Sequence, residues 1–232
     1  MIAVGPDRNL WFTDENFARV GRISTAGRIS TFAVGAETQG IAAGPDGAMW
    51  FTQSSDQIGR ITPGGALTEF DVPLDVAGDA VRITRGPDGN LWFTEFIGNR
   101  IGRITPQGVV TQFPLPTEDA SPFGITAGRD GAVWFTENGA NRIGRITPNG
   151  TITEFPVPTE NSGPMEITLG PDGDLWFTEH LVGNIGRITP AGLVTEIPVP
   201  TPSASPTGIT RGPGGTVWFT DESNNNIGCF GC

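Results

Sequence analysis

The stretch ITAGRDGAVWFTENGANRIGRITPNGTITEFPVPT, residues 125–159, returns with small changes along the whole chain. One tryptophan marks each copy, and the six are Trp11, Trp50, Trp92, Trp134, Trp176 and Trp218. They recur at intervals of about 42 residues, and of about 39 at the first interval. A fixed period of this length is typical of repeated supersecondary units packed against their neighbours.

Within this copy, short runs of β-forming residues alternate with tight turns. Asp130-Gly131 is a strong hairpin signal, and Pro148-Asn149-Gly150 provides a further turn. Pro156 is expected to end the last strand, because proline cannot donate to a central ladder. The sequence therefore predicts four antiparallel strands, over Ile125–Gly128, Ala132–Thr136, Ile143–Thr147 and Thr151–Phe155.

Four antiparallel strands per repeat predict an all-β fold, a β-propeller of four-stranded blades. Six blades are expected in one domain over residues 1–232, with repeats starting near residues 2, 41, 83, 125, 167 and 209. The last blade ends after its third strand and so lacks its outer strand, which indicates a thin blade or a part of a larger ring. A parallel β-helix is the structural alternative, but its coils are shorter and lack three tight turns per unit.

The composition limits the classes of partner. The chain of 232 residues has no lysine and a formal net charge of −11. Nucleic acids and anionic membranes are therefore poor partners, because both recruit basic side chains. No apolar run approaches the about 18 residues of a spanning helix. The first residues lack a basic segment followed by an apolar stretch, so a cytoplasmic location is expected.

The two cysteines, Cys229 and Cys232, form a C-x-x-C motif. This spacing suits half of a zinc site or a redox pair. A zinc site would need two more ligands, and the chain has a single histidine. A terminal segment without a role is the preferred interpretation.

The repeated phrases W-F-T-E, I-G-R-I-T-P and T-E-F-P-x-P-T resemble the streptogramin B lyase family, to which virginiamycin B lyase belongs. The resemblance runs from Ile2 to Gly228. It implies descent from a seven-bladed propeller, in a bacterium, with a role in antibiotic resistance. It also implies an enzyme that linearises cyclic depsipeptides by elimination at an ester C–O bond, using Mg²⁺ and a histidine base. A base near neutral pKa removes the proton, and the cation stabilises the developing enolate.

The residues that leave the second strands are mostly acidic. They are Asp14, Gln53, Glu95, Glu137, Glu179 and Asp221. In a closed propeller they would form a ring on one face, where carboxylates suit a hard cation. Glu95, Glu137, Glu179 and Asp221 are the predicted metal ligands. The alternative is structural: an arginine recurs in the third strand and could pair with each carboxylate.

The resemblance places histidines in a P-H-x-I-T pattern at the entry to the first strands. The matching residues here are Gln39, Val81, Phe123, Met165 and Thr207. The family's base is therefore absent from these positions. His180 follows Glu179 directly and is the predicted substitute base. A pocket for a ligand is predicted from Arg82, Phe96, Phe123, Met165 and Glu166.

Three hypotheses about function remain open. The first is a Mg²⁺-dependent lyase acting on a depsipeptide of the streptogramin B type. The second is a non-catalytic propeller that binds a small-molecule or peptide-like ligand at the same face. The third is a truncated or engineered ring without activity. We expect a monomer if the ring closes, and a dimer formed through the open edge if it does not.

Overall fold

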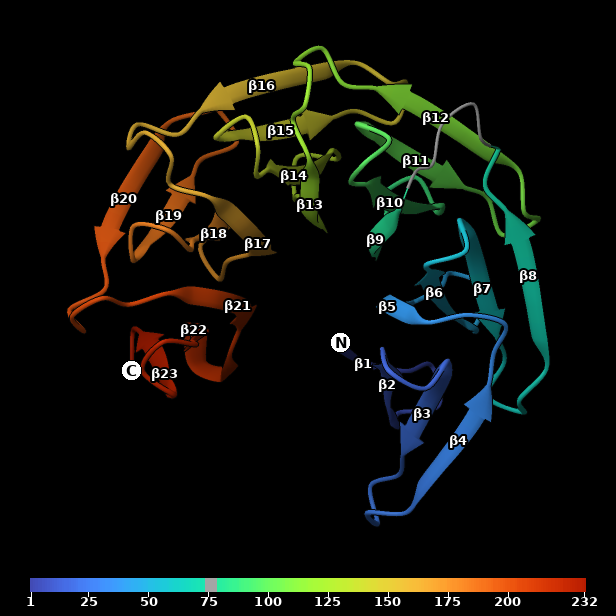
Figure 1. Ribbon diagram of the computed structural model, residues 1–232. Helices are drawn as coiled ribbons and strands as arrows, with labels where there is room; N and C mark the ends of the chain where they lie inside the picture. The colour runs from blue at the N-terminus through green and yellow to red at the C-terminus, as the bar shows by residue number, and fades with distance from the viewer. Residues whose placement is uncertain (74–78) are drawn as a thin grey trace. The chain divides into compact units, whose positions relative to one another are not determined.

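The computed structural model describes residues 1–73 and 79–232. Its described residues form antiparallel sheets, five of four strands and one of three (Figure 1). The chain divides into two compact units, Met1–Pro114 and Leu115–Cys232, and each holds three sheets. No helix in the described part of the chain is long and apolar enough to cross a membrane.

The first unit contains three four-stranded blades, in which successive strands pair in chain order. Their strands are β1 (Ile2–Val4), β2 (Leu10–Asp14), β3 (Arg19–Ile23), β4 (Ile29–Ala33), β5 (Thr38–Ala43), β6 (Met49–Gln53), β7 (Gln57–Ile61), β8 (Leu67–Asp71), β9 (Ala80–Arg85), β10 (Leu91–Glu95), β11 (Arg100–Ile104) and β12 (Val110–Pro114).

The second unit contains two four-stranded blades and one of three strands. Their strands are β13 (Pro122–Ala127), β14 (Val133–Glu137), β15 (Arg142–Ile146), β16 (Ile152–Pro156), β17 (Pro164–Leu169), β18 (Leu175–Glu179), β19 (Asn184–Ile188), β20 (Val194–Pro198), β21 (Pro206–Arg211), β22 (Val217–Asp221) and β23 (Asn226–Phe230). A 3₁₀ turn at Pro213–Gly215 joins β21 to β22. These sheets confirm the predicted fold class of β-propeller blades, the sixth without its outer strand.

The strands differ from their predicted bounds by one to three residues. β16 runs through Pro156, which pairs with Arg142, although the proline was expected to follow the strand. The reason is that β16 is the outer strand of its sheet, where a missing N–H costs no ladder hydrogen bond. β13 begins at Pro122, three residues early, because a β-bulge lies between Pro122 and Ile125.

The hydrophobic cores lie between consecutive blades of the same unit. In one core of the second unit, Trp134 and Ile143 of one blade meet Leu175 and Phe177 of the next, and all four side chains are fully buried. Within a blade, the ring of Phe135 lies against Gly144, where a Cβ atom would collide with the ring. The glycine in each I-G-R phrase therefore makes room for the phenylalanine of the second strand.

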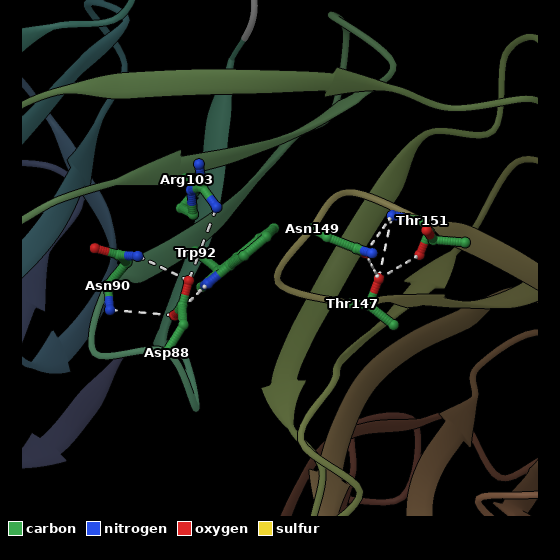
Figure 2. A network of polar contacts seen from close by, with 7 residues as sticks. All are labelled: Asp88, Asn90, Trp92, Arg103, Thr147, Asn149 and Thr151. Carbon is green, nitrogen blue, oxygen red and sulfur yellow. Dashed lines mark hydrogen bonds and ion pairs between the residues drawn. The ribbon is translucent and has the colours of Figure 1, made fainter.

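The aspartate of each P-D-G or R-D-G turn accepts a hydrogen bond from the indole N–H of the tryptophan in the same blade. Asp88 accepts a hydrogen bond from Trp92 Nε1 at 3.0 Å and lies 4.0 Å from Arg103 Nη1 (Figure 2). Asp130 does the same for Trp134 at 3.2 Å and pairs with Arg145 at 2.7 Å. Burial alone would raise the pKa of Asp130, but the donors from Arg145 and Trp134 lower it. The arginines opposite these tryptophans thus pair with turn aspartates, and the expectation that they pair with the carboxylates leaving the second strands is wrong for them. Such a pair does form in the first blade, between Arg19 and Asp14 at 2.8 Å.

The hairpin that joins β15 to β16 has its own polar network. The Thr147 hydroxyl donates to the side-chain oxygen of Asn149, and both accept a hydrogen bond from the Thr151 N–H, at 3.1 Å and 3.3 Å respectively (Figure 2). Gly150 adopts a φ of 90°, which its lack of a Cβ allows. Thr147 and Asn149 therefore shape the turn and serve the fold.

The sixth blade has neither the turn aspartate nor the third-strand arginine that contact the tryptophan in the other blades. Its turn contains no aspartate, and Trp218 Nε1 donates to Thr216 Oγ1 at 2.9 Å. Cys229 stands opposite Trp218, where the other blades carry arginine, and it forms a disulfide with Cys232. The two cysteines are thus bonded to each other, and the interpretation of this segment as one without a role stays a prediction.

Candidate functional site

The candidate site lies where the second strands end and the first strands begin; we call this the bulged rim of each unit. A β-bulge interrupts the pairing of the first and second strands in five blades of the described chain. Pro122 pairs with Glu137, and the next paired residues are Ile125 and Phe135. Phe123 therefore lies inside the bulge, next to the residue that pairs with Glu137. A bulge redirects side chains and often borders a functional site.

In three of the bulged blades, a threonine hydroxyl fixes the backbone of the bulge to the next blade. Thr136 Oγ1 accepts from the Gly124 N–H at 2.8 Å and donates to the carbonyl of Met165 at 2.5 Å. Thr178 Oγ1 makes the equivalent bond to the carbonyl of Thr207 at 2.9 Å. Met165 and Thr207 are two of the residues that match the family's histidine positions. Their backbone is held by these hydrogen bonds to the carbonyl, independently of the side chain.

In the second unit the structure brings three predicted ligand-binding residues together. A Cβ atom on Gly124 would touch the carbonyl of Met165 and the Cα of Glu166, so the bulges at 123–124 and 165–166 lie side by side. Phe123, Met165 and Glu166 are all half-buried there. This rim combines an aromatic ring, a thioether and a carboxylate.

The other two predicted ligand-binding residues belong to the first unit. Arg82 lies in the bulge of β9, where its N–H donates to Thr94 Oγ1 at 3.1 Å. Phe96 follows β10, and its N–H donates to the carbonyl of Asp79 at 3.0 Å. Both side chains are half-buried. Arg82 is equivalent to Glu166, whereas Phe96 is equivalent to Asn138 and His180, which follow their second strands.

The predicted metal ligands lie at the last positions of their strands but are turned into the blades. Glu95, Glu137, Glu179 and Asp221 are at most 2% exposed. Asp221 accepts from the Ser205 N–H at 3.0 Å and from Asn224 at 2.9 Å. Glu95 accepts from Gln112 at 2.9 Å.

Glu137 and Glu179 face carboxyl groups of their own blades. Burial, and next the charge of Glu154, raises the pKa of Glu137 to about 8, against the lowering effect of Arg142. Burial and the charge of Glu196 raise the pKa of Glu179 to about 8.

A magnesium site does not fit these four carboxylates. Within residues 1–73 and 79–232, no group of three or more histidine, cysteine, aspartate or glutamate side chains is placed to hold a metal ion. Their donors come from their own blades, and their burial leaves no face for a hydrated cation. We therefore derive no chemical step from a metal at these residues.

His180, the predicted base, follows the last residue of β18. Its N–H donates to the carbonyl of Gly163 at 3.1 Å, and its side chain is half-buried. The ring atom Nδ1 is buried and has no hydrogen-bond partner in the described residues. A carboxylate that would orient the imidazole through Nδ1 is thus not in place there.

The comparison with protein families decides the relationship. The model of the virginiamycin B lyase family matches residues 1–81 and 75–231. The chain belongs to the virginiamycin B lyase family.

Solved structures agree with this membership. A streptogramin B lyase is 40% identical over 98% of this chain and 77% of its own, with a TM-score of 0.93. A catalytically inactive histidine-to-alanine variant of virginiamycin B lyase from Staphylococcus aureus, with quinupristin, is 42% identical over 98% of this chain and 78% of its own, with a TM-score of 0.94. The selenomethionine-substituted virginiamycin B lyase from Staphylococcus aureus is 41% identical over 99% and 82%, with a TM-score of 0.92. No curated protein matched the chain.

The main feature that the sequence did not predict is the bulge itself. The signal was present in the residue after each candidate histidine position, which alternates between glycine and a long side chain along the repeats: Gly40, Arg82, Gly124, Glu166 and Gly208. An isolated glycine within a strand pattern often marks a bulge or a close backbone approach. In this family member it marks both.

Proposed function

We propose that the bulged rim of the second unit binds a cyclic depsipeptide of the streptogramin B class. Family membership supports the class of ligand, since the inactive lyase variant was solved with quinupristin. The observation that carries the proposal is the paired bulge, which holds Phe123 and Met165 half-buried on a backbone fixed by threonine hydroxyls. Preorganised apolar side chains beside a polar group suit an aromatic, amide-rich ring.

The binding test uses quinupristin and calorimetry on the native chain. We expect saturable binding, weakened at least about tenfold by the double variant Phe123→Ala/Met165→Ala, since a buried anchor contributes over 1 kcal/mol. Leu193→Ala is the matched control, because Leu193 is 67% exposed at the opposite strand ends of the same unit. Equal affinity in the double variant would place binding elsewhere, and no heat at any concentration would refute the proposal.

Elimination at the ester is the second candidate function, and His180 is the observation that favours it. A base would take the proton from the carbon next to the ester-bearing carbon. The electron pair would form the C=C bond, and the C–O bond would break to release a carboxylate. The imidazole of His180 is half-buried at this rim and would be the group that takes the proton.

The catalytic test follows the mass of the product. Elimination opens the ring without changing the mass, whereas hydrolysis adds one water, so chromatography with mass spectrometry separates the two. We expect an isomeric linear product that disappears in His180→Ala while quinupristin affinity is retained. The Mg²⁺ dependence implied by the family stays a prediction, tested by running the assay with magnesium and with a chelator. Binding without product under both conditions would leave a ligand-binding propeller.

A further inference from the structure

A cavity of about 520 Å³ lies in the second unit, between the turn that follows β18 and the connection from β20 to β21; we call it the Gly183 cavity. Gly183 and Asn184 line it on the side of the turn, and Thr201 and Ala204 line it on the side of the connection. The described residues that line it are aliphatic, hydroxyl-bearing or amide residues, and none carries a charge. A neutral ligand therefore suits this cavity better than an ion.

The preceding blade contains the same turn with a different residue. Asn141 is the last residue before β15, as Gly183 is the last residue before β19. Both accept the same backbone hydrogen bond, from the Val157 N–H to the Asn141 carbonyl at 3.0 Å and from the Val199 N–H to the Gly183 carbonyl at 2.9 Å. The two turns are therefore equivalent, and the asparagine of one is a glycine in the other.

The carboxamide of Asn141 joins its turn to the connection that follows β16. Its Nδ2 donates to the carbonyl of Val157 at 3.2 Å and to the carbonyl of Thr159 at 2.9 Å. Its Oδ1 accepts from the N–H and from the hydroxyl of Ser162, both at 2.8 Å. One primary amide thus pairs two backbone carbonyls and one backbone N–H in this blade.

The matching backbone groups line the Gly183 cavity. They belong to Val199, Thr201 and Ala204. Among residues 1–73 and 79–232, the carbonyls of Val199 and Thr201 and the N–H of Ala204 have no hydrogen-bond partner. Val199 and Thr201 are half-buried, and Ala204 is 8% exposed. Two acceptors and one donor thus lie beside the cavity, and burial makes unpaired backbone groups costly.

The chain cannot supply the amide from this turn without a movement of the backbone. Gly183 has a φ of 70°, and a Cβ atom there would lie 2.9 Å from the carbonyl oxygen of Ala204. Any side chain at this position therefore requires the connection to shift. An amide group from a separate molecule needs no Cβ atom at residue 183.

We propose that the Gly183 cavity binds a primary carboxamide carried on a small apolar group. The amide NH₂ donates to the carbonyls of Val199 and Thr201, and the amide oxygen accepts from the Ala204 N–H. The apolar group contacts Leu181 and Val182, which line the same cavity and are 68% and 37% exposed. A carboxylate of the same shape does not fit, because it has no hydrogen to donate to the two carbonyls. This site is separate from Phe123 and Met165, which are not among its lining residues.

The test on the native chain is a ¹H–¹⁵N NMR titration with isobutyramide, beside isobutyrate as the probe of equal shape. We expect isobutyramide to shift the Ala204 N–H saturably, in the millimolar range usual for a ligand of this size. Isobutyrate should bind at least about tenfold more weakly, because it loses two hydrogen bonds. Quinupristin binding at the bulged rim is a separate measurement, so the two proposals can fail independently.

Two substitutions test the assigned position. Gly183→Asn adds a carboxamide that competes for the same groups, so isobutyramide should bind at least about tenfold more weakly. Gly27→Asn is the matched control and should keep the affinity, because Gly27 is an exposed turn glycine with a φ of 78° and no atom within 4 Å of its Cβ position. Asn141→Gly is the positive counterpart and should create a second isobutyramide site, at Val157, Thr159 and Ser162.

Four results would overturn the proposal. On the native chain, these are the absence of a saturable shift at Ala204 and an equal response to isobutyramide and isobutyrate. Neither depends on the folding of a variant. The others are unchanged affinity in a folded Gly183→Asn variant and a single binding site in a folded Asn141→Gly variant.

Discussion

At the scale of single residues, a buried indole determines the chemistry of the turn beside it. Trp11, Trp50, Trp92 and Trp134 are fully buried, and their Nε1 donors need an acceptor. An aspartate four residues earlier provides it at 3.0 to 3.2 Å in each of these blades. The third-strand arginine then holds the aspartate and lies over the indole, 5.8 Å from the ring centre at Arg145 and Trp134.

Asp130→Ala tests this arrangement. The change leaves Trp134 Nε1 buried without its acceptor and Arg145 without its ion pair, so we expect a loss of about 1 to 3 kcal/mol in the free energy of unfolding. Urea unfolding followed by tryptophan fluorescence measures it. Glu118→Ala, at an exposed loop glutamate, is the control and should change stability by less than about 0.5 kcal/mol. Equal losses in the two variants would contradict the assigned role of Asp130.

The sequence predicted residue types at this scale better than it predicted their partners. The arginine of I-G-R was expected near the carboxylates that end the second strands, but register places Arg145 opposite Trp134, at the other end of the hairpin. The alternation of apolar and polar residues predicts which face of a strand each side chain is on. The cross-strand partner of a charged side chain depends on the pairing register, and a shift of one residue changes it. The carboxyl neighbours of Glu137 and Glu179 were not predicted from the sequence.

At the scale of elements, the bulge in the first strand is the main difference between the predicted blade and the observed one. Second, third and fourth strands match their predicted bounds to within one residue in the repeat at 125–159, because alternation and Asp-Gly or Asn-Gly turns define them. The first strand does not, because its extra residue is held by hydrogen bonds to Thr136 and to the neighbouring blade. Such long-range bonds leave no periodic signal in the strand itself.

Gly124→Ala tests the close approach at this bulge. A Cβ atom there would meet the carbonyl of Met165, which is backbone and cannot swing aside, so we expect about 1 to 3 kcal/mol of destabilisation. Thermal unfolding measures the loss, and quinupristin binding should weaken in parallel if the bulge shapes the ligand site. Gly64→Ala is the matched control, because the nearest atom to its Cβ would lie at 3.8 Å. A stable Gly124 variant would show that the two bulges can separate freely.

At the scale of the whole molecule, the sixth blade exposes a surface that the other blades cover. Trp218 is 38% exposed and Ile227 is 70% exposed, while the matching Trp134 and Ile143 are fully buried under the blade that follows. β23 is also an edge strand. Exposed edges and apolar faces of this kind promote association.

We therefore expect the chain of residues 1–232 to self-associate through the sixth blade. Sedimentation velocity over a concentration series should show a dimer that Ile227→Lys weakens at least about tenfold, since a charge would have to be buried in an apolar contact. Val109→Lys is the control, at a turn residue that is 61% exposed. A native chain that sediments as a monomer at every concentration would contradict this expectation.

The repeat period allowed the architecture to be predicted from the sequence, because each copy repeats the same local signals and errors in one copy are corrected by the others. The single-domain prediction for residues 1–232 stays a prediction, since the two units Met1–Pro114 and Leu115–Cys232 are each described separately. The binding role of the predicted site residues stays a prediction. Phe123, Met165 and Glu166 do share a rim, whereas the gathering of carboxylates about a common axis stays a prediction.

The partial exposure of Trp218 also provides an optical probe. Four of the six indoles are fully buried and Trp176 is 9% exposed, so a neutral collisional quencher such as acrylamide reaches Trp218 first. Its emission should be red-shifted relative to the other five, and the quenchable fraction should report on the sixth blade alone. Events at this blade can therefore be followed in the unlabelled protein, without introducing any dye.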